Sequence, residues 1–165
     1  MTIFTDALYR NIEIHQAPRR IVSLVPSITE ALFTFGVGDA VVGVTRFCVE
    51  PRDGVAAKQK VGGTKTLDVS SVRQLEPDLV IANVEENRPE DVRQLIAAGL
   101  NVMVTFPRTV AAGIQMMRQI AEMTDSVATA RPIIEEADAA LAMRARRMSP
   151  AARCAYFARS GGTPG

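Results

Sequence analysis

The side chains best suited to bind a ligand fall into five short segments of the 165-residue chain. These segments are Pro26-Ser27, Phe47-Cys48 with Glu50, Gly63-Thr64-Lys65, Glu85-Glu86-Asn87-Arg88, and Arg108. A cysteine thiolate and a carboxylate can coordinate a borderline metal, which makes Cys48 and Glu50 weak candidate metal ligands. Binding is favoured over catalysis, because the single histidine, His15, is remote from these segments and no nucleophile–base pair stands out.

Two of the segments also have a structural interpretation. Cys48 can be a small buried residue, with Phe47 packed under its loop. The stretch 62–65 can be a flexible turn, or it can cradle an anionic group through backbone N–H donors, with Lys65 adding charge. Its glycine spacing excludes a P-loop.

The acidic segment, Glu85-Glu86-Asn87-Arg88, has a structural interpretation for some of its residues and a ligand-binding one for the others. Asn87 can cap a helix that begins at Pro89. Arg88 and Arg108 can hold ligand carboxylates or amide oxygens bidentately, or can form ion pairs with neighbouring acids. Glu85 and Glu86 have no such structural explanation, so they are the better site candidates.

Strand-like runs alternate with helical patterns along the chain. Strands are expected at residues 11–15, 20–24, 41–45, 78–82 and 101–105, and helices at 27–35, 69–75, 90–98 and 109–123. Ser27 and Glu30 have the spacing of a capping box. This order predicts an α/β fold with a mostly parallel sheet and flanking helices, that is, a Rossmann-like lobe.

Ligands of such sheets bind beyond the carboxyl ends of the strands. The loops after Leu24, Thr45, Ala82 and Thr105 all begin at that edge, and they hold most of the candidate segments. The connection over residues 46–66 is unusually long for a compact domain, which also favours a functional role.

A long helix is expected over residues 126–148. Val127, Ala130, Ile134, Ala137 and Leu141 recur at helical spacing. A helix of this length spans about 30 Å. Residues 153–157 then resemble the start of a new strand. The expected division is an N-terminal ligand-binding lobe (1–124), a spanning helix (125–149) and the start of a truncated second lobe (150–165).

Composition argues against several classes of partner. The formal net charge is +1 and aromatic residues make up 5%, which gives no reason to expect nucleic acid or an anionic membrane as partner. No apolar stretch approaches the length of a membrane span. The first residues lack a basic leader followed by an apolar core, so a cytoplasmic location is expected, or a periplasmic one if the start site is misassigned.

Several motifs together resemble the binding proteins for cobalamin and iron-siderophores, a family with two α/β lobes joined by one long helix. They are RIVSLVPSITE at 20–30, VVGVT at 41–45, VGG at 61–63 and LEPDLV at 75–80. TRFCV at 45–49, GGTK at 62–65, EENR at 85–88 and TFPRT at 105–109 resemble a signal-less branch, the helical-backbone metal receptors. The resemblance implies a non-enzymatic protein that binds a metal chelate in a cleft between lobes, associated with an ABC transporter or acting in the cytoplasm.

This sequence departs from the family at two positions. Relatives usually carry a histidine where Glu50 precedes Pro51. In the transporter branch, a glutamate near the short helix docks on the permease, and here Ser70 stands at that position, with Asp68 nearby. Two alternatives to chelate binding stay open at this point. One is a metal-dependent enzyme or metal chaperone that uses Cys48, Glu50, Glu85 and Glu86, and the other is a non-functional truncated fragment.

Overall fold

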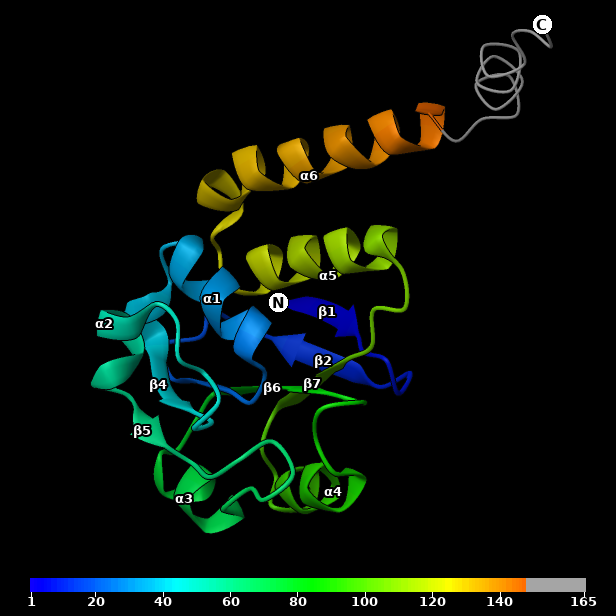
Figure 1. Ribbon diagram of the computed structural model, residues 1–165. Helices are drawn as coiled ribbons and strands as arrows, with labels where there is room; N and C mark the ends of the chain where they lie inside the picture. The colour runs from blue at the N-terminus through cyan, green and yellow to red at the C-terminus, as the bar shows by residue number, and fades with distance from the viewer. Residues whose placement is uncertain (148–165) are drawn as a thin grey trace, which may run out of the picture.

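A five-stranded parallel sheet forms the centre of the protein (Figure 1). The computed structural model describes residues 1–147. The strands are β3 (Ile21–Ser23), β4 (Val41–Val44), β5 (Gln59–Lys60), β6 (Leu79–Asn83) and β7 (Val102–Thr105). They pair in the order β5-β4-β3-β6-β7, and every pair is parallel. The predicted α/β fold with a mostly parallel sheet is therefore confirmed.

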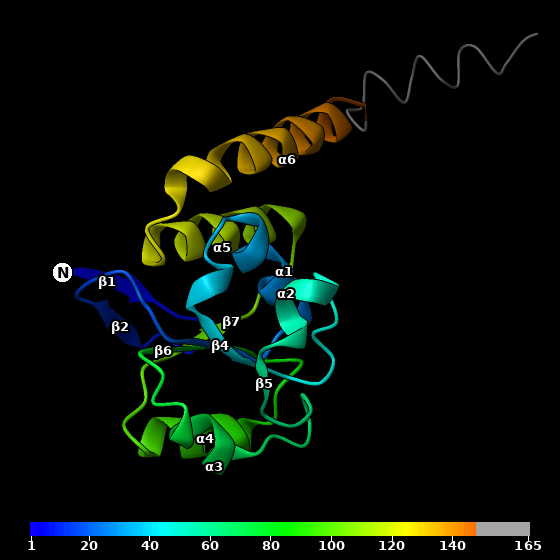
Figure 2. The same cartoon turned by 90° about the vertical axis from the view of Figure 1, so that its left-hand side faces the viewer.

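Helices cover both faces of this sheet (Figure 2). Helices α1 (Pro26–Thr34) and α5 (Val110–Met123) lie on one face, and α3 (Val69–Gln74) and α4 (Pro89–Ala97) lie on the other. Alternate strand residues serve the two cores: Ile21 and Ile81 pack toward α1 and α5, whereas Val22 and Val80 pack toward α3 and α4. Burial on both faces explains why the strands are continuously apolar.

Helix α6 (Val127–Arg147) packs along α5. Ala130 and Ile134 are buried in the core, and Arg118 of α5 forms an ion pair with Asp138. Residues 142–145 are exposed, since this end of the helix extends away from the lobe (Figures 1 and 2). Pro132 lies inside the helix rather than at its start. The expected strand at 153–157 lies outside the described residues. None of the helices formed by residues 1–147 is both long enough and apolar enough to cross a membrane.

The strand predicted at residues 11–15 is confirmed as β2 (Asn11–Ile14), whereas β1 (Thr2–Thr5) and several other short elements were not predicted from the sequence. Strands β1 and β2 form an antiparallel hairpin, and its turn attaches to β7 through a hydrogen bond from the Ala7 N–H to the Val104 carbonyl. The long connection after β4 contains helix α2 (Arg52–Ala56) and the exposed strand β5. A 3₁₀ turn, η1 (Gly38–Ala40), follows α1. Strand β1, helix α2, strand β5 and η1 escape sequence patterns because each is short and buries few residues.

Two predicted helix caps are wrong. Helix α1 begins at Pro26 with Val25 at the N-cap, so Ser27 lies within the first turn and forms no capping box with Glu30. Helix α4 begins at Pro89 with Arg88 at the N-cap, and no side chain caps it. In both helices a proline occupies the first turn, where its fixed φ suits the helix and its missing N–H costs nothing. The predicted cap of α5 is confirmed, because the Thr109 hydroxyl accepts from the Ala112 N–H.

Asp68 caps α3, and this cap makes a testable contribution to stability. Its carboxylate accepts hydrogen bonds from the Ser71 hydroxyl and the Ser71 N–H, which lower its pKa. A depressed pKa means that the stabilisation is present above the unfolded value of about 3.9 and is lost as pH falls through the folded pKa. We therefore expect Asp68→Asn to lower the melting temperature at pH 7, and the difference from wild type to shrink below about pH 4. Thermal melts of both proteins across pH would measure this, and a pH-independent difference would contradict it.

Candidate functional site

The loops at the carboxyl edge of the sheet bring most of the predicted site segments together. Val44, Ser23, Ile81 and Met103 occupy matching positions in β4, β3, β6 and β7. Three residues further along each chain segment come Phe47, Pro26, Val84 and Phe106. Pro26 is half-buried, whereas Phe47, Val84 and Phe106 are 49%, 37% and 36% exposed. The edge therefore presents apolar side chains to solvent after β4, β6 and β7.

Two arginines lie over the exposed phenylalanines. The Arg46 guanidinium carbon lies 5.1 Å from the centroid of the Phe47 ring, and that of Arg108 lies 5.7 Å from the centroid of Phe106. Both separations fit cation–π contacts. The Arg46 N–H donates to the Gly62 carbonyl. This hydrogen bond connects the loop after β4 to residues 62–65, called the glycine loop below. Phe47 and Arg46 also border Gly63 closely.

The glycine loop uses one of its backbone donors within the loop itself. The Gly63 N–H donates to the Thr66 carbonyl at 3.0 Å, so this donor is not free, and Gly63 itself is buried. The Gly63 N–H is therefore not available to the anion cradle predicted for residues 62–65. Lys65 is exposed, and its ammonium group donates to the Glu85 carbonyl, which joins this loop to the acidic segment.

Asn83, the last residue of β6, shapes the acidic segment. Its side-chain oxygen accepts from the N–H groups of Glu85 (2.8 Å) and Glu86 (3.2 Å). Glu85 is exposed and Glu86 is half-buried. Neither carboxylate forms an ion pair with any residue in the 1–147 range. The two acids thus lie on the edge just after β6, between the loops that follow β3 and β7.

Asn87 has a different role from the predicted one. It is only 2% exposed, and its side-chain oxygen accepts from the Asn83 N–H at 2.8 Å. Its amide nitrogen donates to the carbonyls of Leu24 and Thr64, each at 3.4 Å. Asn87 therefore links three loops of the edge as a positioning residue and is neither a ligand contact nor a helix cap.

The predicted metal pair, Cys48 and Glu50, is also wrong. Cys48 is 1% exposed, and its thiol contacts the hydroxyls of Thr29 (3.2 Å) and Thr45 (3.3 Å) inside the core. Glu50 is exposed and lines a pocket of about 500 Å³ on the α1 side, together with Glu30, Phe33, Thr34 and Pro51. Over residues 1–147, no three His, Cys, Asp or Glu residues converge as a metal site, so Cys48, Glu50, Glu85 and Glu86 do not form a metal-dependent centre.

The remaining predicted residues divide between exposed and paired positions. Ser27 is exposed in the first turn of α1, and Thr64 is half-buried. Arg88 lies 3.8 Å from a Glu90 carboxylate oxygen, which confirms the ion-pair alternative for this residue. Arg108 forms no ion pair with residues 1–147. Sequence reasoning did not select Arg46, Asn83 and Phe106, although each lies at or just beyond the end of a buried strand.

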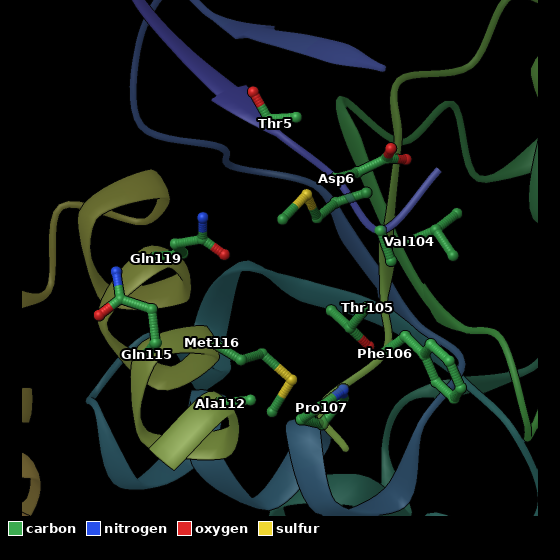
Figure 3. A pocket seen from close by; sticks show the side chains of 12 residues that line it. Thr5, Asp6, Val104, Thr105, Phe106, Pro107, Ala112, Gln115, Met116 and Gln119 are labelled. Atoms are coloured by element: carbon green, nitrogen blue, oxygen red, sulfur yellow. The ribbon is translucent and has the colours of Figure 1, made fainter. Parts of the chain in front are cut away.

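A separate pocket of about 230 Å³ lies beside the edge, between the N-terminal hairpin and α5 (Figure 3). Gln115, Met116 and Gln119 of α5 face Thr5 and Asp6 across it. The Asp6 carboxylate forms an ion pair with Arg10. None of the residues selected from the sequence lines this pocket, but Phe106 does, so the pocket adjoins the edge at the end of β7.

The sequence of this chain matches those of known binding proteins. A sequence profile for a family described as periplasmic binding protein matches residues 21–158. An uncharacterized ABC transporter substrate-binding lipoprotein of Bacillus subtilis is 38% identical over 100 residues, covering 59% of this chain and 31% of the relative. A vitamin B12-binding protein of Yersinia pestis is 30% identical over 122 residues, covering 74% of this chain and 41% of the relative.

Two solved structures of binding proteins also match this chain in fold. A periplasmic vitamin B12 binding protein of Vibrio cholerae matches with a TM-score of 0.69 and 22% identity, over 75% of this chain and 48% of that one. A periplasmic heme-binding protein of Roseiflexus in its apo form matches with a TM-score of 0.63 and 29% identity, over 79% and 51%. The chain thus spans less than half the length of these two curated relatives and about half of these two solved chains.

Proposed function

Because this chain belongs to the periplasmic binding protein family, we propose that it forms one ligand-binding lobe, with its connecting helix, of a binding protein for a metal chelate such as cobalamin or a ferric siderophore. The observation that carries the proposal is the edge formed by the loops after the strands. It presents exposed aromatic rings, basic groups and two acids without ion-pair partners among residues 1–147, at the place where open parallel sheets bind ligands. The relatives with an assigned ligand are named for binding vitamin B12 or heme, which supports a non-enzymatic role.

Helix α6 fits the role of a connector between two lobes. Its 21 residues extend about 30 Å. Ala130 and Ile134 anchor it in the core, Leu141 packs partly buried against the same core, and residues 142–145 are exposed. The exposed end offers a place for a second lobe to begin. With one lobe present, only one side of a chelate would be covered.

An ABC permease is the proposed partner, since one relative is named as an ABC transporter substrate-binding lipoprotein. The docking contact expected from the family is not supplied by Ser70, which is exposed in the first turn of α3. Asp68 is exposed, but its carboxylate is held by Ser71. Permease docking of this lobe would therefore rely on other residues.

Calorimetric titration tests the binding proposal. We expect the 165-residue chain to bind cyanocobalamin, hemin or ferrichrome, about 100-fold more weakly than a two-lobed relative binds its chelate, because one lobe buries about half of the ligand surface. The two-lobed vitamin B12-binding protein of Yersinia pestis serves as the positive control. Absence of heat and of any absorbance change with all three chelates at millimolar concentration would overturn the proposal.

A further inference from the structure

A pocket of about 240 Å³ lies on the flank of the lobe, where the turn of the N-terminal hairpin meets α4 beside the edge strand β7. Val92 and Val104 are buried and form its base, Ile96 extends its wall along α4, and Leu8 and Val84 are exposed at its mouth. The exposed rings and charged side chains of the strand-end loops do not line it. Although the pocket shares Val84 with the carboxyl edge, it is therefore a different site from the one proposed to bind a chelate.

Hydrogen bonds hold the hairpin side of this pocket in place. The Ala7 N–H donates to the Val104 carbonyl at 2.9 Å. The buried Asp6 carboxylate accepts from the N–H groups of Leu8 and Arg10, each at 2.9 Å, and pairs with the Arg10 guanidinium. The turn that carries Leu8 is thus fixed on β7. Because the wall is formed in advance, a ligand does not have to order it on binding.

The polar side chains that line the pocket are engaged within the protein. The Asn83 oxygen accepts from two backbone N–H groups of the acidic segment, and its nitrogen donates to the Thr105 hydroxyl at 3.3 Å. The Asn87 oxygen accepts from the Asn83 N–H, and its nitrogen donates to two backbone carbonyls. A ligand therefore meets an apolar interior in which the amide groups already have partners, and its buried part should be apolar.

Arg93 is the one charged residue among those of the described chain that line the pocket. Its side chain is 71% exposed, which places the guanidinium at the mouth. One terminal nitrogen donates to Glu90 at 3.0 Å, and the same carboxylate lies 3.8 Å from Arg88. One carboxylate is thus shared by two guanidinium groups. Since a guanidinium has five N–H donors, Arg93 keeps donors for the carboxylate of a ligand.

We propose that this pocket binds a small monocarboxylate with a compact apolar body, such as an arylacetate. An apolar cavity of about 150 Å³ already admits benzene, so this larger pocket has room for a phenyl ring with a short substituent. The ring lies against Val92 and Val104, and the carboxylate reaches Arg93 at the mouth. The proposal does not depend on chelate binding, because it concerns a second site with its own residues.

Phenylacetate is the probe, in an NMR titration of the ¹⁵N-labelled 165-residue chain. We expect saturable shifts with a Kd of about 1 mM, largest at the amides of Leu8, Val84, Val92, Arg93 and Val104. 2-Phenylethanol has the same ring without the carboxylate and should bind about fivefold more weakly. Acetate has the carboxylate without the ring and should give no saturable shifts at these amides.

Variants connect the two parts of the ligand to the residues. Arg93→Gln should reduce phenylacetate affinity to that of 2-phenylethanol, and should change the affinity for the alcohol by less than about twofold. Ile96→Trp should fill the pocket and abolish binding of both ligands. If that variant does not fold, Val84→Trp at the exposed mouth tests the same point. Arg73→Gln removes an exposed arginine of α3 outside the pocket, and should leave both affinities unchanged.

Three results would overturn the proposal. The first is the absence of saturable shifts at about ten times the expected Kd, and the second is their restriction to the strand-end loops. The third is equal affinity for phenylacetate and 2-phenylethanol, or phenylacetate binding that Arg93→Gln leaves unaltered, since either would remove the carboxylate from the ligand class. Because chelate binding is measured separately by calorimetry, failure of this site and failure of the proposed function are distinguishable.

Discussion

Gly62→Ala is expected to destabilise the protein by about 3 kcal/mol, a decrease of about 6–12 °C in melting temperature. Gly62 has a φ of +98°, a region that costs an L-residue about 1–2 kcal/mol. A Cβ at this position would also lie 2.4 Å from the Thr66 carbonyl oxygen and 2.9 Å from the Asp68 nitrogen. Both are backbone atoms, so the clash cannot be relieved by a change of rotamer.

The expected effect reaches the site because Gly62 organises two loops. Its carbonyl accepts from the Arg46 N–H, and it forms an isolated antiparallel bridge with Leu67. Displacing it would move Arg46 and Lys65 relative to the acidic segment. Chelate affinity should therefore fall in Gly62→Ala even at a temperature where the protein remains folded.

Two control variants separate backbone conformation from steric overlap. Gly99 has a φ of +79° but no heavy atom within 4 Å of an added Cβ, so Gly99→Ala should cost only the conformational term of about 1–2 kcal/mol. Gly113 lies in α5 with equally open space, and Gly113→Ala should stabilise by about 0.5–1 kcal/mol. Chemical denaturation of the three variants measures the series. A Gly62→Ala protein as stable as Gly99→Ala would show that the backbone clash is relieved.

The sheet and the position of the site follow from sequence patterns for a clear physical reason. Strands buried on both faces need continuous apolar residues, as in Leu79–Asn83, and strands in parallel sheets must be joined by crossovers that place successive loops at one edge. β5 is invisible to this reasoning because both of its residues, Gln59 and Lys60, are exposed. β1 buries only Phe4.

The direction of individual loop side chains was less predictable. Cys48 and Glu50 are two residues apart, yet one points into the core and the other lines a pocket on the α1 side. The turn from Thr45 to Cys48 decides this, through a hydrogen bond from the Cys48 N–H to the Thr45 carbonyl. The direction of the Asn87 side chain likewise depends on a backbone group. Its oxygen accepts from the Asn83 N–H, which only the folded strand places within reach.

Asn87→Leu is expected to cost about 2–4 kcal/mol, because it leaves buried polar groups without partners. The Asn83 N–H loses its acceptor, and the Leu24 carbonyl loses its donor. The leucine has similar volume, so the loss reflects unpaired hydrogen-bonding groups more than a cavity.

Asn101→Leu provides a matched control for the same substitution. Asn101 is partly exposed and its side chain makes one hydrogen bond, to the Glu13 carbonyl, so the expected cost is within about 1 kcal/mol. Urea denaturation should show the difference between the two variants. A second difference is expected in binding: Asn87 joins the end of β3, the glycine loop and the acidic segment, so its loss should weaken hemin binding, whereas Asn101→Leu should leave it unchanged. Equal stability of the two variants would mean that water or a loop shift satisfies the groups that Asn87 binds, and the edge would then be held by its backbone alone.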